Sequence, residues 1–124
     1  EKREEIPAND GLNTKKEVII SSEKNPKKLD LYGNSNIKWL YVVPKYPCKL
    51  EELDFSKLND FDGYSNHCDH FLAPLSAVIL GAKMIEIHIT SDKNKNFVDN
   101  PVSFEPDELN KIISLIRSVK KINF

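Results

Sequence analysis

The sequence lacks any apolar run long enough to cross a lipid bilayer. Its longest apolar stretch, residues 72–82, falls well short of the ~20 residues that a transmembrane helix needs. The charged opening at residues 1–5 contains no apolar core of the kind found in signal peptides. These absences predict a cytoplasmic protein with no membrane partner.

An excess of one sign of charge is also missing. The chain has 18 Lys and Arg against 19 Asp and Glu, a net charge of −1, and the two signs are interspersed. No basic stripe is present that would attract a phosphate backbone. The composition therefore argues against nucleic acid as a partner and favours small molecules or proteins.

Cysteine is scarce, with only Cys48 and Cys68 in 124 residues. Two cysteines cannot form a disulfide framework, and a single bridge would need a geometry that a sequence does not reveal, so we expect free thiols. A zinc site drawn from His67, His70 and the two cysteines is conceivable, but the spacing fits no standard zinc finger. The length fits one domain over residues 1–124.

What the sequence does contain is a series of short strand-like runs rich in β-branched residues. They predict strands at 18–22, 37–43, 61–67 and 84–90, with a further short strand ending in the turn-forming stretch 6–11. Short helical segments at 25–36 and 50–59 separate some of these runs. The alternation of strands and helices predicts an α/β fold with a partial, barrel-like parallel sheet of about five strands and short crossover helices.

Two longer helices are expected in the second half of the chain. Residues 72–80 have the composition of a buried helix, with Pro74 in the first turn and Gly81 as the stop. The last helix begins at Pro106, and its apolar stripe marks a core-facing side rather than a cofactor site. The stripe consists of Leu109, Ile112, Ile113, Ile116 and Val119.

A histidine lies at the end of each of two strand-like runs, His67 after 63–66 and His88 within 84–90. In the second run the isoleucines alternate with Met84, Glu86, His88 and Thr90, so polar groups share the face opposite the apolar one. That pattern suits a barrel strand whose outer face packs under helices and whose inner face carries chemistry. A histidine in such a strand is also commonly an ordinary core residue, and Glu86 could be a barrel-interior carboxylate paired with a base.

Ordered motifs over nearly the whole chain resemble the sialic acid synthase family, which uses phosphoenolpyruvate to make N-acetylneuraminate and related nonulosonic acids. The family pattern GYSDHT is similar to residues 63–68, ALGAKVIEKHFT to residues 79–90, and D-x-x-x-SLEPDEL to residues 99–109. Weaker matches fall at 5–10, 18–24 and 46–47. The resemblance implies the second half of a TIM barrel, compressed or fragmentary, because a closed barrel needs ~200–250 residues.

The resemblance also implies a metal site and a substrate pocket. In the family, the histidines matching His67 and His88 bind a divalent metal, Mn²⁺ or Mg²⁺, that polarises the sugar aldehyde while phosphoenolpyruvate attacks it. Further positions match residues around the substrates. The candidate catalytic residues are Asp99, which matches an aspartate that holds the acceptor sugar, and Tyr46, which matches a tyrosine that lines the pocket. The candidate substrate-binding residues are Ser21 and Ser65, which match hydroxyls that contact phosphoenolpyruvate, and Asp10, which takes the place of a carboxylate near the substrate.

Several positions depart from the family pattern. Glu5 replaces a lysine that binds the anionic substrate, which reverses the charge where phosphate or carboxylate needs a cation. The other departures are Ala8 for serine, Pro44 for asparagine, Asn66 for aspartate, and Glu23-Lys24 for Gly-Met. Two hypotheses follow: a synthase-like domain condensing phosphoenolpyruvate with an N-acyl sugar such as N-acetylmannosamine, or a degenerate barrel half serving metal binding, ligand binding or assembly. Either version predicts a homo-oligomer or a barrel-completing partner, because a half barrel leaves open strand edges.

Overall fold

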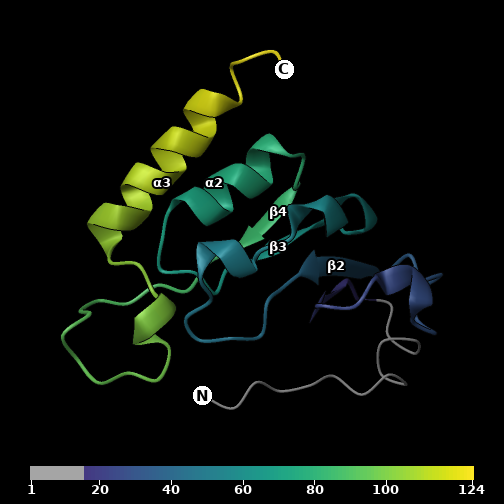
Figure 1. The fold of residues 1–124 in the computed structure, drawn as a ribbon, viewed down its shortest axis with the longest axis horizontal. Coiled ribbons are helices and arrows are strands. Elements are labelled where there is room, and N and C mark those ends of the chain that lie inside the picture. The colour runs from purple at the N-terminus through teal and green to yellow at the C-terminus, as the bar shows by residue number, and fades with distance from the viewer. Residues whose placement is uncertain (1–15) are drawn as a thin grey trace.

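The computed structural model describes residues 16–124 and shows a sheet of four parallel strands (Figure 1). The strands β1 (Val18–Ser22), β2 (Ile37–Tyr41), β3 (Gly63–Ser65) and β4 (Met84–Glu86) lie side by side in the order of the sequence. The α/β class and the parallel strand order are as predicted. About five strands were expected, and the fifth, near residues 6–11, falls outside the described residues.

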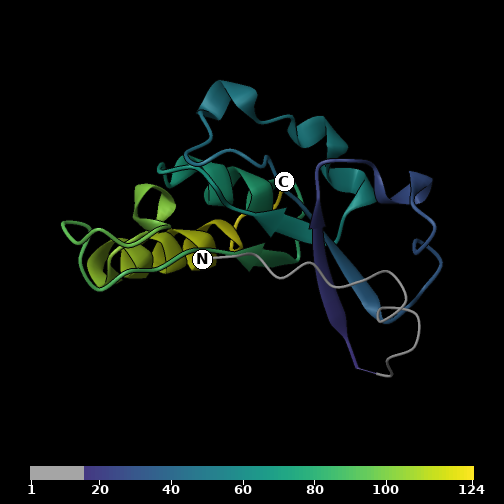
Figure 2. The same ribbon diagram turned by 90° about the horizontal axis from the view of Figure 1, so that it is seen from below.

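Short helical turns connect the first three strands, and two α-helices follow. The 3₁₀ turns η1 (Pro26–Lys28), η2 (Leu50–Glu52) and η3 (Phe55–Asp60) replace full crossover helices. The helices α2 (Leu72–Ile79) and α3 (Pro106–Val119) lie next to each other, with the short turn η4 (Asn100–Val102) just before α3 (Figures 1 and 2). In residues 16–124, none of these helices is long and apolar enough to span a membrane.

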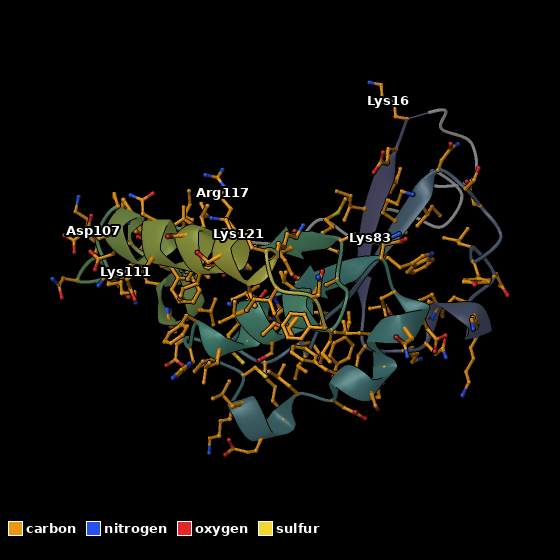
Figure 3. All side chains as sticks on the ribbon, turned by 90° about the horizontal axis from the view of Figure 1, so that it is seen from above. Lys16, Lys83, Asp107, Lys111, Arg117 and Lys121 are labelled. Carbon is orange, nitrogen blue, oxygen red and sulfur yellow. The ribbon has the colours of Figure 1, made fainter. Side chains whose placement is uncertain are left out.

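The helix α3 begins where the sequence places its signals. Pro106 takes the first turn, and Glu105 forms a capping box with Glu108, whose carboxylate accepts a hydrogen bond from the Glu105 N–H at 3.2 Å. The predicted apolar stripe is the side that packs, with Ile112 fully buried. The charged side chains of this helix extend from the surface of the molecule (Figure 3). Local capping and amphipathicity together explain this helix.

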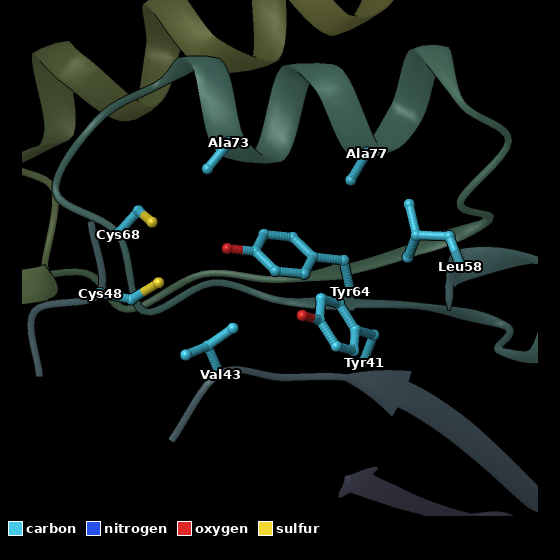
Figure 4. Close-up of a cluster of buried hydrophobic side chains, with 8 residues drawn as sticks. All are labelled: Tyr41, Val43, Cys48, Leu58, Tyr64, Cys68, Ala73 and Ala77. Carbon is cyan, nitrogen blue, oxygen red and sulfur yellow. The ribbon is translucent and has the colours of Figure 1, made fainter. Parts of the chain in front are cut away.

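The hydrophobic core lies between the sheet and α2. Ala73 and Ala77 project from α2 toward the Tyr64 ring, with the Tyr41 ring beyond it and Cys48 and Cys68 at one end of the cluster (Figure 4). The prediction of a buried helix holds only for the small residues of α2. Leu72, Ile79 and Leu80 are exposed, because α2 packs with one narrow face and small side chains are what permit its close approach to the sheet.

The predicted strand 84–90 is shorter than expected. β4 ends at Glu86, and the chain then exchanges hydrogen bonds with a different segment: Phe104 N–H donates to the His88 carbonyl at 2.9 Å, and Thr90 N–H donates to the Phe104 carbonyl at 3.0 Å. Ile89, expected on a covered apolar face, is 66% exposed, whereas Thr90 is buried. The predicted alternation of covered isoleucines and polar residues fails beyond Glu86, because the backbone there pairs with Phe104 and no longer with β3.

Strands β3 and β4 approach very closely at Gly63. A Cβ atom at this position would lie 1.9 Å from the Met84 carbonyl oxygen, so only glycine fits. Gly63 and Met84 are direct partners in the parallel register. The position of His88 relative to His67 therefore depends on a residue that has no side chain.

Candidate functional site

The two histidines follow neighbouring parallel strands at the same edge of the sheet. His67 comes two residues after β3 ends, and His88 two residues after β4 ends. Their imidazole centroids are 5.5 Å apart, with the ring planes at 65°. The carboxyl ends of parallel strands are where side chains from different strands converge in α/β proteins. The structure thus brings together the pair that the sequence singled out.

His67 is held rigidly. The side chain is 1% exposed, and its Nδ1 lies 2.9 Å from the Val43 carbonyl oxygen. Because a carbonyl can only accept, Nδ1 carries the proton and the neutral ring has its lone pair on Nε2. The Tyr46 ring stacks on the imidazole at 4.1 Å between centroids. Backbone and aromatic contacts therefore define both the tautomer and the orientation of this histidine.

His88 is less constrained. Within residues 16–124 its Nδ1 atom is buried and has no hydrogen-bond partner. Its ring lies at 89° to the Tyr46 ring, with 6.2 Å between centroids, so Tyr46 contacts both imidazoles. Tyr46 precedes a cis peptide bond to Pro47 and is about half exposed. A buried, unsatisfied imidazole nitrogen is the kind of atom that a ligand or metal would satisfy.

Asn66 links Tyr64 and Cys68, on either side of His67 in the chain, through hydrogen bonds that the sequence did not reveal. Its Oδ1 accepts a hydrogen bond from the Tyr64 hydroxyl at 3.0 Å, and its Nδ2 donates to the Cys68 carbonyl at 2.7 Å. Burial raises the pKa of Tyr64, which keeps this hydroxyl a donor. An aspartate here could not donate to Cys68, so the departure from the family pattern has a structural reason in this chain. The signal for this network in the sequence was an amide side chain at Asn66, directly before His67 at the end of a strand-like run.

The predicted substrate-contacting hydroxyls are separated. Ser65 is fully buried, and its Oγ donates to Glu86 Oε1 at 2.6 Å, so the serine rather than a base is the partner seen for this carboxylate. Ser21 lies in β1, two strands away from β3. Asp10, together with the departures at Glu5 and Ala8, lies outside the described residues. Pro44 is exposed in the loop before Tyr46.

Asp99 lies in the loop that follows β4, immediately before η4. It lines a cavity of about 310 Å³ whose wall contains neither imidazole. Ile89 also lines this cavity. Because Ile89 follows His88 directly in the chain, the cavity that contains Asp99 adjoins the histidine pair along the backbone. Of the predicted site residues in the described part, His67, His88 and Tyr46 cluster, whereas Asp99 and Ser21 lie apart from them.

The described residues contain no group of three or more His, Cys, Asp or Glu side chains that could hold a metal. The two imidazoles are thus the only predicted ligands brought together between residues 16 and 124, and the zinc alternative with the cysteines is not formed there. Cys48 and Cys68 are buried free thiols. Burial raises the pKa of the Cys48 thiol to about 12 and also raises that of Cys68, so both are protonated and poor ligands at neutral pH.

Comparison with known proteins agrees with this architecture. Residues 9–123 match the NeuB family, and the chain belongs to that family. It is 34% identical over 93 residues to the N,N'-diacetyllegionaminic acid synthase of Campylobacter jejuni, covering 69% of this chain and 28% of that protein. It is 31% identical over 96 residues to the N-acetylneuraminate-9-phosphate synthase of Homo sapiens, covering 71% and 27%.

A crystal structure of the N-acetylneuraminic acid (sialic acid) synthetase from Leptospira borgpetersenii serovar Hardjo-bovis, in complex with citrate, has the same fold. It superposes with a TM-score of 0.66 at 32% identity, covering 70% of this chain and 33% of the synthetase. The matches cover between 26% and 31% of the first curated relatives. The chain is therefore similar to one part of a TIM-barrel synthase, and its sheet is a partial barrel.

Proposed function

We propose that this chain forms part of the active site of a synthase that condenses phosphoenolpyruvate with an N-acyl sugar. The observation that carries the proposal is the pair of imidazoles at the carboxyl edge of the parallel sheet, 5.5 Å apart and in contact with Tyr46. Membership of the NeuB family supports the same reaction class. Relatives named as sialic acid and legionaminic acid synthases support the substrate class.

The two histidines suit a divalent metal such as Mn²⁺ or Mg²⁺. His67 presents the lone pair of Nε2, because its Nδ1 is turned to the Val43 carbonyl. Within the described part, His88 has a buried nitrogen without a partner. When bound, the ion would act as a Lewis acid toward the carbonyl of the acceptor sugar. Two neutral imidazoles leave most coordination positions to substrate oxygens and water.

The other residues have supporting roles in this proposal. Tyr46 stacks on the His67 ring and contacts His88, which limits the movement of the two imidazoles. Ser65 binds phosphoenolpyruvate when its hydroxyl is released from Glu86, and Ser21 and Asp10 add polar contacts from earlier strands. Asp99 holds the acceptor sugar. Because the chain spans less than a third of the first relatives, we also propose that a barrel-completing partner or a second copy supplies the remaining substrate contacts.

Manganese binding tests the site. We expect His67→Ala and His88→Ala each to weaken Mn²⁺ affinity at least about tenfold, measured by calorimetry or paramagnetic line broadening. His70→Ala is the matched control, because the His70 ring stacks on Phe71 and its Nδ1 accepts a hydrogen bond from the Leu72 N–H, so its loss should leave affinity unchanged. Unchanged affinity in both site variants would reject the metal site.

Consumption of phosphoenolpyruvate in the presence of N-acetylmannosamine and Mn²⁺ tests the reaction separately. Consumption that depends on both His67 and His88 supports the synthase. Metal binding without consumption supports the second candidate, a degenerate barrel half that binds metal or ligand. This second candidate is favoured by one observation: within residues 16–124, no third metal-ligating side chain joins the two histidines.

A further inference from the structure

Three large apolar side chains are exposed around the cavity beside Asp99. Ile89, Phe97 and Val98 are 66%, 50% and 70% exposed, and all three line the same cavity of about 310 Å³. The loop that carries Phe97 and Val98 is otherwise polar. The other residues that line this cavity are polar: Thr90, Ser91, Asp99, Asn100 and Ser103. Apolar and polar side chains gathered at one concave site are typical of ligand pockets.

Most polar side chains in the wall are already engaged within the loop. The Thr90 hydroxyl donates to the Asp92 carbonyl at 3.3 Å, Ser103 Oγ donates to the Asp99 carbonyl at 2.6 Å, and Asn100 Nδ2 donates to the Asp92 carbonyl at 3.1 Å. These bonds shape the cavity. By contrast, the Asp99 carboxylate makes no hydrogen bond or ion pair with any residue between 16 and 124. Asp99 is therefore the charged acceptor available to a ligand.

The charge of the wall is negative. Asp99 is the one ionisable residue among the residues that line this cavity, and no lysine, arginine or histidine joins it there. Lys93, in the same loop, has its Nζ 2.7 Å from Glu108 Oε1 and lies over the Phe104 ring. A phosphate group placed in this cavity would meet a carboxylate without a compensating cation.

We propose that this cavity selects an uncharged sugar with an apolar substituent, such as a second acyl group, and rejects a phosphorylated sugar. This inference rests on the proposed function, in which Asp99 holds the acceptor. The Asp99 carboxylate accepts from a sugar hydroxyl or amide N–H, while Phe97, Val98 and Ile89 contact the methyl group of the substituent. Among the relatives, the named products include both a diacetylated acid and a phosphorylated one, so the two alternatives are real within the family.

Binding of three sugars to the unmodified chain tests the selectivity. The probes are a di-N-acetylated deoxyhexose, N-acetylmannosamine and N-acetylmannosamine 6-phosphate, each measured by calorimetry and saturation-transfer NMR without metal or phosphoenolpyruvate. We expect the diacylated sugar to bind about tenfold more tightly than N-acetylmannosamine, since one buried apolar group contributes that order of discrimination. The phosphorylated sugar should bind most weakly. Equal or tighter binding of the phosphorylated sugar, or no binding of any sugar, would overturn the proposal.

Substitutions in the cavity wall test whether Phe97 and Val98 cause the preference for the diacylated sugar. Phe97→Ser and Val98→Ser should each weaken binding of the diacylated sugar about threefold to tenfold, and these exposed positions can change without loss of the fold. Leu80→Ser, equally apolar and exposed but at the end of α2, is the control and should have no effect. Asp99→Asn should narrow the gap between N-acetylmannosamine and its phosphate. If both the Phe97 and the Val98 variant bind the diacylated sugar as tightly as the unmodified chain does, the assignment is wrong.

The binding result and the synthase result can fail independently. Selective sugar binding without phosphoenolpyruvate consumption would retain the pocket and reject the synthase. Consumption of phosphoenolpyruvate with the phosphorylated sugar as the preferred acceptor would retain the synthase and reject the pocket selectivity.

Discussion

The central strands and the edge strands of the sheet differ in how completely they are covered. In β3 every residue is buried, and in β2 all but Lys38 are, whereas Ile19 and Glu86 are exposed in β1 and β4. Within residues 16–124, β1 and β4 form the two edges of the sheet. The contrast indicates a sheet whose central strands are covered on both faces and whose edge strands are the places where a barrel would continue.

The histidines follow the same division. His67, after a central strand, has its ring nitrogen on the Val43 carbonyl and a tyrosine stacked on its face. His88, after an edge strand, keeps a buried nitrogen without a partner in the part that the structure describes. The candidate site is thus preorganised on one side and open on the other, which is what a site completed by further strands or by a ligand requires.

The contact between a central and an edge strand should be the most sensitive point. We expect Gly63→Ala to destabilise the fold by more than about 3 kcal/mol, because the new Cβ would overlap the Met84 carbonyl and force β3 and β4 apart. Urea unfolding followed by circular dichroism measures the change. Gly33→Ala, where a Cβ meets no atom within 4 Å, should be close to neutral. A Gly63→Ala protein as stable as the parent would show that this strand contact is not tight.

Truncating apolar residues should reproduce the difference between centre and edge. Leu40→Ala in β2 should cost about 3 kcal/mol, since Leu40 is almost fully buried and its removal leaves a cavity. Ile19→Ala in β1 should cost less than about 1 kcal/mol, because nearly half of that side chain is already in water. Equal losses of unfolding free energy in the two variants would mean that β1 is covered in solution, by a second copy or a barrel-completing partner.

Replacing the Asn66 amide, which bonds to Tyr64 and Cys68, should have an intermediate effect. Asn66→Asp places a carboxylate in a fully buried position and removes the donor to the Cys68 carbonyl, so we expect a loss of about 2 kcal/mol. Because the buried acid is more stable when protonated, its folded-state pKa rises and the loss should shrink as pH falls. Asn59→Asp, at an exposed position, is the control. A difference in unfolding free energy between variant and parent that stays constant from about pH 4 to about pH 8 would contradict this account.

The smallest effect is expected at the thiols of the core. Burial raises the pKa of Cys48 to about 12, so the folded protein keeps a proton that the unfolded chain releases near its ordinary pKa of about 8.5. Stability should therefore be fully retained below pH ~8.5 and decline as the pH rises toward the folded value. Alkylation by iodoacetamide at pH 8 should be slow in the native protein and fast in urea. Rapid native labelling of Cys48 would show that the core opens readily.

The sequence predicts the regular parts of this fold and less of its site. The positions of β1, β2 and β3, the parallel order and the start of α3 at Pro106 follow from β-branched runs and capping residues, which act locally. The end of β4 does not, because pairing of His88 and Thr90 with Phe104 joins segments distant in sequence. The exposure of Leu72 in α2 also depends on which elements are present to cover it.

For the site, the approach of His67 to His88 is confirmed, since strand-end residues on adjacent parallel strands must meet at one edge. The Val43 carbonyl that orients His67 could not be foreseen, because a backbone acceptor has no sequence signature. The roles assigned to Asp99, Ser21 and Ser65 stay predictions. Their positions came from motif resemblance, and the structure shows where they lie but not what they bind.

The order of the strands has a consequence for how the chain acquires its shape during synthesis. Between residues 16 and 124, each strand after β1 lies beside the strand made just before it, so each new segment can add to the sheet as it leaves the ribosome, without waiting for a distant part of the chain. At each stage the growing sheet presents one new edge for the next segment, and in the part that the structure describes β4 is such an edge. A sheet built in this way needs no pairing with strands that are distant in the sequence, so neighbouring strands alone can assemble a portion of a barrel.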